Sequence, residues 1–136
     1  ITLTDERMTR FWITLEGGVR FVIACLEKMK GGEIFVPKIP SMKIMDLVKA
    51  IAPQAKVKVI GIRPGEKIHE ILVSEEECFR TIARGDYYAI RPILPELGGS
   101  GGGTPVLESE YCSRDNTLDR EALRSLLSEA GFLSGL

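Results

Sequence analysis

The sequence is poor in the residues and motifs that most enzyme active sites require. It has a single histidine, His69, so a Ser-His-Asp arrangement could use that residue alone. It has no Gly-x-Ser-x-Gly elbow and no Walker loop, and the glycine run at 98–103 does not fit Gly-x-Gly-x-x-Gly. The nearest approach to a Tyr-x-x-x-Lys pair is Tyr87 with Arg91, which lacks the lysine. We therefore expect no catalytic residue in this chain and a structural, hydrogen-bonding His69.

Cysteine is scarce and scattered. Cys25, Cys78 and Cys112 form no Cys-x-x-Cys or Cys/His cluster, which argues against a metal site. An odd number of widely spaced cysteines is typical of reduced thiols, and this predicts a cytoplasmic protein. Cys25 falls on the apolar face of an expected helix and is interpreted as a core residue.

Excess charge of one sign and long apolar runs are also lacking. The formal net charge is −1, which gives no electrostatic reason to expect a nucleic acid partner. No apolar run approaches the roughly 20 residues that span a bilayer, so we expect no membrane span. The N-terminus has no basic region before an apolar one, as a signal peptide would. Position 1 is Ile and opens a strand-like run, which predicts a fragment whose upstream part is missing.

The hydrophobic periodicity predicts an α/β fold with a small mixed sheet and packed helices. Residues 68–73 fit either a strand or a helical turn. We expect Ser41, Ser74 and either Asn116 or Thr117 as helix caps, with Glu77 completing a capping box. Strands are expected at 1–4, 33–37, 56–62 and 87–90, and helices at 11–29 (at least from 15), from the Ser41 cap to Pro53, at 74–83 and at 116–132.

The most informative stretch is the turn that follows the strand expected at 56–62. Pro64-Gly65 favours a tight turn because Pro fixes φ and Gly accepts a positive φ. Arg63 carries a planar fork of donors that suits a phosphate, and Glu66 offers two acceptors for sugar hydroxyls. The alternative is a charged surface turn in which Arg63 and Glu66 simply pair.

A second basic residue, Arg10, precedes the first expected helix and has aromatic neighbours at Phe11 and Trp12. A helix N-terminus favours an anion, so Arg10 and Arg63 could converge on one diphosphate. The alternative is two unrelated surface arginines.

Three segments of the sequence, 1–13, 32–43 and 61–70, together resemble a known enzyme family. They are similar to the C-terminal part of the configuration-inverting UDP-N-acetylglucosamine 4,6-dehydratases, extended short-chain dehydrogenase/reductases with a Rossmann-type fold. The resemblance covers residues 1 to about 92 and is weaker in the final helix. It implies a nucleotide-sugar-binding part at 1–97. The composition predicts a flexible glycine-rich loop at 98–104, which departs from the pattern of the family, and a C-terminal tail with a terminal helix at 105–136.

The resemblance also implies a ligand and the residues that bind it. The complete enzymes bind NADP and convert a UDP-sugar to a 4-keto-6-deoxy product used in surface polysaccharides or glycans. Carried over by motif, Arg10 and Arg63 contact the UDP diphosphate, and Glu66 contacts the ribose. The cofactor loop and the catalytic residues of the family lie upstream of residue 1, so the chain alone is expected to hold no cofactor and to be inactive.

Two other interpretations remain open. The chain could be a non-catalytic, oligomeric α/β interaction module, or part of a related nucleotide-sugar epimerase. Exposed apolar faces on the first helix and on strand 33–37 predict self-association or association with the missing N-terminal Rossmann part.

Overall fold

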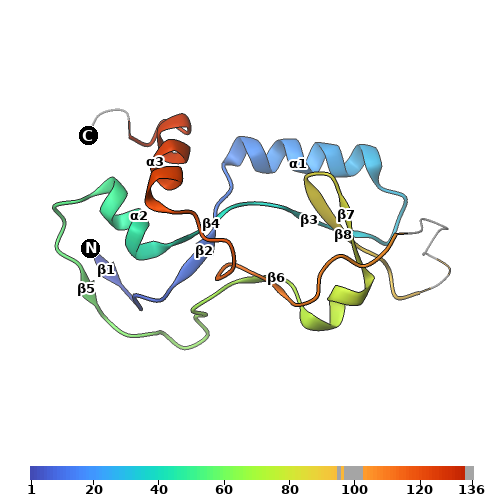
Figure 1. Ribbon diagram of the computed structural model, residues 1–136, viewed down its shortest axis with the longest axis horizontal. Helices are drawn as coiled ribbons and strands as arrows, with labels where there is room; N and C mark the ends of the chain where they lie inside the picture. The colour runs from blue at the N-terminus through green and yellow to red at the C-terminus, as the bar shows by residue number, and fades with distance from the viewer. Residues whose placement is uncertain (95, 97–102, 134–136) are drawn as a thin grey trace. The chain divides into compact units, whose positions relative to one another are not determined.

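The computed structural model describes residues 1–94, 96 and 103–133, which form two compact units. The glycine-rich loop expected at 98–104 lies, except for its last two residues, outside the described residues. Both units combine segments that are distant in the sequence (Figure 1). The first unit comprises Ile1–Trp12, Pro40–Glu70 and Ser113–Leu136, and the second comprises Ile13–Ile39 and Ile71–Cys112.

The first unit holds two short strand pairs and two helices. Strand β1 (Thr2–Leu3) pairs in parallel with β5 (Lys58–Val59), and β2 (Thr9–Phe11) pairs antiparallel with β4 (Ser41–Lys43). Helices α2 (Ile44–Ile51) and α3 (Arg120–Glu129) pack against each other. Their shared core is formed by the buried side chains of Met42, Leu123 and Leu127.

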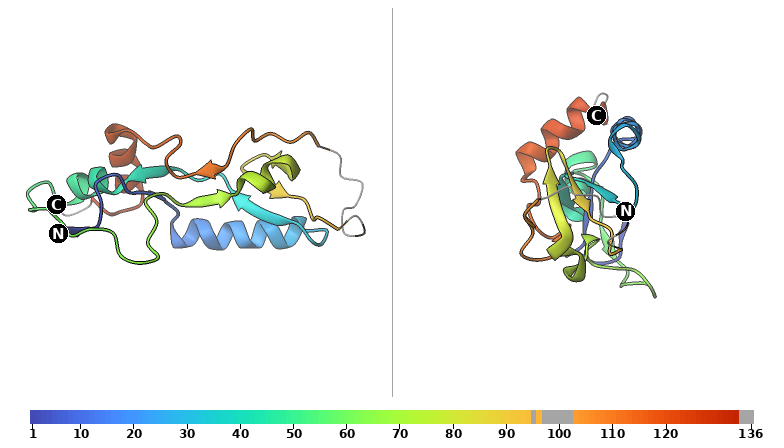
Figure 2. Two further views of the ribbon diagram at one scale, coloured as in Figure 1. Left: turned by 90° about the horizontal axis from the view of Figure 1, so that it is seen from below. Right: turned by 90° about the vertical axis from the view of Figure 1, so that its right-hand side faces the viewer.

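The second unit is built on a three-stranded antiparallel sheet with the order β3-β8-β7. Its strands are β3 (Ile34–Pro37), β7 (Thr81–Arg84) and β8 (Tyr87–Ile90), and a second pair joins β6 (Ile71–Val73) to β9 (Tyr111–Cys112). Helix α1 (Leu15–Lys28) runs alongside β3 (Figure 2). The core consists of Val36, Val73, Cys78 and Ile90.

Helix α1 begins at Leu15, the later of the two starts that the sequence allows. Residues 11–14 are not helical: Phe11 belongs to β2, and Thr14 caps the helix by accepting a hydrogen bond from the Gly17 N–H at 3.0 Å. The expected apolar face is present but uncovered, since Leu15 is 87% exposed and Leu26 is 65% exposed. Cys25 is accordingly half-buried and not a core residue.

The helix predicted at 74–83 is wrong beyond its start. Ser74 and Glu77 form the expected capping box, but the segment Glu75–Arg80 is a 3-10 helix, η1. The chain then enters β7, where Thr81 and Ile82 are buried and pair with β8. β-branched side chains fit a pleated, half-buried surface better than a helix, and the tertiary pairing decides the conformation here.

Three further boundaries need correction. The strand expected at 56–62 is reduced to β5, which pairs with only two residues of β1, and Gly61 leaves the extended region with φ 89°. Ser41 does not cap α2; it is buried within β4, and the N-cap position is Lys43. Helix α3 does not start at 116 but is capped by Asp119, whose carboxylate accepts from the Ala122 N–H at 2.9 Å.

The described residues contain neither a membrane-spanning helix nor a metal-binding cluster. No helix there combines the length and apolar character needed to cross a bilayer. In the same residues, no three His, Cys, Asp or Glu side chains gather where they could hold a metal ion. All three cysteines are free thiols.

Candidate functional site

The Pro64-Gly65 turn forms as the sequence predicts. The Glu66 N–H donates to the Arg63 carbonyl at 3.0 Å, which closes the turn. Gly65 has φ 81°, a value that suits glycine at the third position of a type II turn. The turn therefore holds the backbones of Arg63 and Glu66 close together.

The Glu66 carboxylate is held from two sides. Oε2 accepts from the Arg63 N–H at 3.1 Å, and Oε1 accepts from the Thr4 hydroxyl at 3.0 Å. These hydrogen bonds lower the pKa of Glu66, and the positive charges of Arg63 and Arg10 add to the effect. The carboxylate is thus ionised at neutral pH and, because each oxygen can accept a second hydrogen bond, it can still accept hydroxyl donors.

Arg10 lies on β2 in the first unit, and its side chain contacts residues 67–70, which directly follow the turn. Its Nη1 donates to the carbonyls of Thr9 at 2.7 Å and Ile68 at 3.1 Å, and its Nη2 donates to the carbonyl of Lys67 at 2.9 Å. Its Nε is 3.5 Å from a carboxylate oxygen of Glu70, and the side chain is 28% exposed. The guanidinium therefore links β2 to residues 67–70. The position of Arg10 in the sequence, before the first expected helix, gives no indication of this role.

Arg63 differs from Arg10 because its guanidinium is not engaged. The residue is exposed, and in the described part of the chain its side chain has no hydrogen-bond or ion-pair partner. The pairing of the Arg63 and Glu66 side chains that the alternative interpretation required does not form. Arg63 and Glu66 thus share one turn, Arg10 contacts the residues that directly follow this turn, and the Arg63 guanidinium is left open to solvent.

A polar network centred on the buried Thr9 and Ser113 contacts residues 69–70, just after the turn, and little in the sequence points to it. His69 Nδ1 is 2.8 Å from the Thr9 hydroxyl, which is 2.7 Å from the Ser113 hydroxyl. This agrees with a structural His69. Thr4, Thr9 and Glu70 lie in or near the recognised segments and were missed because their types carry no distinctive signal. Ser113 lies 43 residues beyond Glu70, and no local pattern connects the two.

Asp5, next to Thr4, gives a testable pH-dependent contact. Its carboxylate accepts hydrogen bonds from Arg7 at the backbone N–H, Nε and Nη2, at 2.8, 3.0 and 2.8 Å. These bonds lower the pKa of Asp5 from 3.8 to about 2. Because the folded chain favours the ionised form, the contact's stabilisation is complete above pH 3.8 and is lost as the pH falls through about 2.

We therefore expect the Asp5 carboxyl carbon, followed by NMR during an acid titration, to change shift with a midpoint near pH 2. Arg7→Ala should move that midpoint back toward 3.8, whereas Arg84→Ala should leave it unchanged. An Asp5 midpoint near 3.8 in the unmodified chain would refute the contact.

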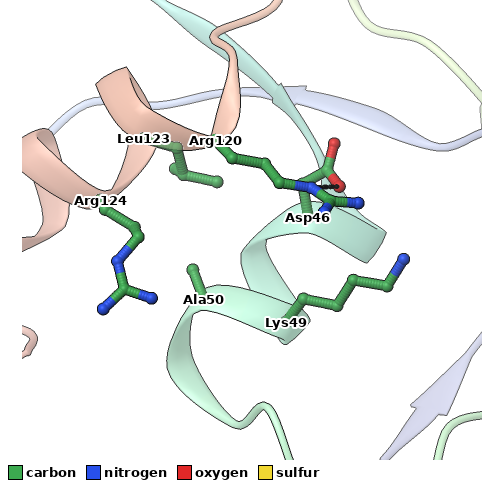
Figure 3. Close-up of a pocket in the computed structure, with 6 residues that line it drawn as sticks. All are labelled: Asp46, Lys49, Ala50, Arg120, Leu123 and Arg124. Carbon is green, nitrogen blue, oxygen red and sulfur yellow. Dashed lines mark ion pairs between the residues drawn. The ribbon is translucent and has the colours of Figure 1, made fainter.

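A separate small pocket lies between α2 and α3. Its volume is about 170 Å³, and its lining residues are Asp46, Lys49, Ala50, Arg120, Leu123 and Arg124. Figure 3 shows Arg120 directed toward Asp46, with its Nε 3.5 Å from Oδ1, and Arg124 on the other side of Ala50. The cations flank the pocket without converging, and no serine, threonine or cysteine lines it.

The fold and the turn define an α/β chain that presents an open arginine beside an ionised glutamate. A model of the polysaccharide biosynthesis protein family matches residues 1–92, and the chain belongs to that family. An inverting UDP-N-acetylglucosamine 4,6-dehydratase of Campylobacter jejuni subsp. jejuni serotype O:2 is 58% identical over 94 residues, 69% of this chain. A UDP-glucose 4-epimerase of Rickettsia canadensis is 39% identical over 94 residues, 66% of this chain.

Among solved structures, Pen from Bacillus thuringiensis superposes with a TM-score of 0.85 at 29% identity, over 98% of this chain. These matches confirm the resemblance to the inverting dehydratases and the expected fold class, an α/β part of an extended short-chain dehydrogenase/reductase. The chain spans 28% of the length of each of the two curated relatives and 42% of the length of Pen.

Proposed function

We propose that this chain supplies the UDP-binding half-site of a UDP-N-acetylglucosamine 4,6-dehydratase that makes sugars for surface polysaccharides or glycans. Arg63 binds the diphosphate, Arg10 adds positive charge beside it, and Glu66 accepts hydrogen bonds from the ribose hydroxyls. The observation that carries the proposal is the unengaged Arg63 guanidinium on the same turn as the ionised Glu66. The 58% identity to a protein named as such a dehydratase supports the choice of ligand.

The arrangement suits the electrostatics of a nucleoside diphosphate. A guanidinium presents paired N–H donors that match two phosphate oxygens, and charge-assisted hydrogen bonds are the stronger ones. Ionised Glu66 would repel a phosphate placed directly against it, so the ribose is the part of the ligand that it can accept. Thr4 and the Arg63 N–H fix the Glu66 carboxylate before the ligand arrives, which reduces the entropy lost on binding.

The proposal assigns no redox step to this chain. Complete enzymes of the resembling type use NADP, but the chain has no Gly-x-Gly-x-x-Gly fingerprint to hold a dinucleotide. It also has no Tyr-x-x-x-Lys pair. The residues present do not fit the cofactor, and the chain alone is proposed to bind the nucleotide part of the substrate without converting it.

The test is a calorimetric titration of the 136-residue chain with UDP-N-acetylglucosamine, UDP and uridine. We expect saturable binding of both diphosphates and at least tenfold weaker binding of uridine, which lacks the charge that Arg63 recognises. Arg84→Ala, which removes an exposed arginine of the second unit, should bind like the unmodified chain. A chain that is folded by circular dichroism and binds no UDP at millimolar concentration would overturn the proposal.

A second candidate function, an oligomeric interaction module without a ligand, is favoured by α1. None of its residues is buried, and Leu15, Val22 and Leu26 expose more than half of their surface. Such a face favours association, either with another copy or with the Rossmann part of a longer protein. Light scattering and UDP titration together distinguish the two candidates. An interaction module should have a mass above that of one chain and should bind no UDP.

A further inference from the structure

Ser113 occupies an unusual position beside the candidate site. It follows β9 directly, is fully buried at 0% exposure, and lies outside the residues 1–92 that the family model matches. Its backbone N–H donates to the Glu70 carbonyl at 2.8 Å, and its hydroxyl accepts from the Glu70 N–H at 2.8 Å. The N–H and the carbonyl of Glu70 are thus both hydrogen-bonded to Ser113, and the Glu70 carboxylate pairs with Arg10.

The hydroxyl of Ser113 also reaches β2. Because its oxygen accepts from Glu70, its own hydrogen is free to be donated toward Thr9, whose hydroxyl lies at 2.7 Å and whose carbonyl lies at 3.3 Å. The Thr9 hydroxyl can in turn donate to Nδ1 of His69 at 2.8 Å when that nitrogen carries no proton. Hydrogen bonds therefore run in one direction from Glu70 through Ser113 and Thr9 to His69.

This network determines where the Arg10 side chain is held. Thr9 is 3% exposed and immediately precedes Arg10 on β2, and its N–H donates to the Ile68 carbonyl at 3.0 Å. The Arg10 guanidinium contacts the carbonyls of Ile68 and Lys67, directly after Glu66 in the chain. A change in the register between β2 and residues 67–70 would therefore move Arg10 relative to Glu66 and Arg63.

We propose that Ser113 is a positioning residue of the UDP half-site, through which the C-terminal tail fixes Arg10 and the 66–70 segment for the diphosphate. This inference rests on the proposed function. It assigns to the tail a part in ligand binding that the recognised motifs, all within residues 1–70, do not contain. Ser113 itself does not contact the ligand, because its side chain is buried and its hydroxyl is used by Glu70 and Thr9.

The test compares two buried serines in the full chain. Ser113→Ala removes the hydroxyl that links Glu70 to Thr9, whereas Ser41→Ala removes a similarly buried hydroxyl of the same unit that donates to the Asp115 carbonyl at 3.1 Å. We expect Ser113→Ala to weaken UDP binding about five- to tenfold and Ser41→Ala to change it less than twofold. Equal losses of UDP affinity in the two variants would show that Ser113 has only a general structural role, and would overturn the inference.

A second pair of variants applies if Ser113→Ala does not fold. Thr9→Val keeps the shape of the side chain but has no hydroxyl, and Thr9→Ser keeps the hydroxyl. Thr9→Val should lower the affinity for UDP as Ser113→Ala does, and Thr9→Ser should restore it to within twofold. Equal affinities in Thr9→Val and Thr9→Ser would contradict the network.

Amide hydrogen exchange without ligand separates this inference from the proposed function. The Glu70 N–H should exchange at least tenfold faster in Ser113→Ala than in Ser41→Ala, since its acceptor is lost only in the former. Unchanged Glu70 exchange would overturn the positioning role even if the chain binds UDP. Faster exchange in a chain that binds no UDP would instead show that the network exists and that the proposed function fails.

Discussion

Replacing Arg63 with alanine is expected to weaken UDP binding about 10- to 150-fold. A hydrogen bond to a charged group contributes about 1.5–3 kcal/mol, and each 1.4 kcal/mol corresponds to about a tenfold change in affinity. The guanidinium has no partner among the described residues, so its removal breaks no internal contact. The effect should therefore appear in binding and leave the free energy of unfolding within about 0.5 kcal/mol of that of the unmodified chain.

Calorimetry of Arg63→Ala beside Arg63→Lys and Arg84→Ala checks this expectation. Lysine keeps the charge but loses the bidentate fork, so Arg63→Lys should fall between the other two. Arg84→Ala controls for the loss of one positive charge elsewhere. If Arg63→Ala and Arg84→Ala bound UDP equally well, Arg63 would have no part in recognition, and the alternative of a solvated surface turn would be preferred.

Replacing Leu127 with alanine is expected to lower the free energy of unfolding by about 2–5 kcal/mol. Leu127 is 0% exposed and packs with Met42 and Leu123 in the core between α2 and α3. Truncation loses the burial of several methyl and methylene groups and leaves a cavity that its neighbours fill only in part. Domains of ordinary stability have about 5–15 kcal/mol in total, so this one change removes a large share.

Urea denaturation followed by circular dichroism measures the change, and Leu15→Ala is the matched control. Leu15 is 87% exposed, so the same truncation there should shift the stability by about 0.5 kcal/mol or less. A loss at Leu15 as large as at Leu127 would show that the α1 face is covered in solution. A negligible loss at Leu127 would contradict the core described for the first unit.

The parts of the fold that local chemistry determines could be predicted from the sequence. Pro64-Gly65 requires a turn because of its dihedral preferences, and Ser74 with Glu77 satisfies a helix start through side-chain hydrogen bonds. The amphipathic spacing from Leu15 onward predicted α1 correctly. Each of these signals lies within a few residues of the structure that it determines.

The features that the sequence did not reveal depend on partners outside the segment that carries the local signal, whether a few residues away or far along the chain. Thr81–Arg84 is a strand because β8 pairs with it, although the capping box before it predicted a longer helix. Ser113 is joined to Thr9 across 104 residues, and nothing in either neighbourhood marks the pair. The roles of Arg10, Arg63 and Glu66 in ligand binding stay predictions.

If residues 62–70 and Arg10 form a UDP-binding half-site, the side chains of Arg10 and Arg63 must respond to the bound nucleotide. NMR of the arginine Nε–H signals during a titration with UDP tests it most directly, with uridine as the parallel ligand. We expect the Arg63 signal to shift and saturate with UDP, the Arg10 signal to shift with it, the Arg84 signal to remain fixed, and uridine to move none of them. Signals of Arg63 and Arg10 that stay unchanged in a folded chain at millimolar UDP would contradict the proposed half-site.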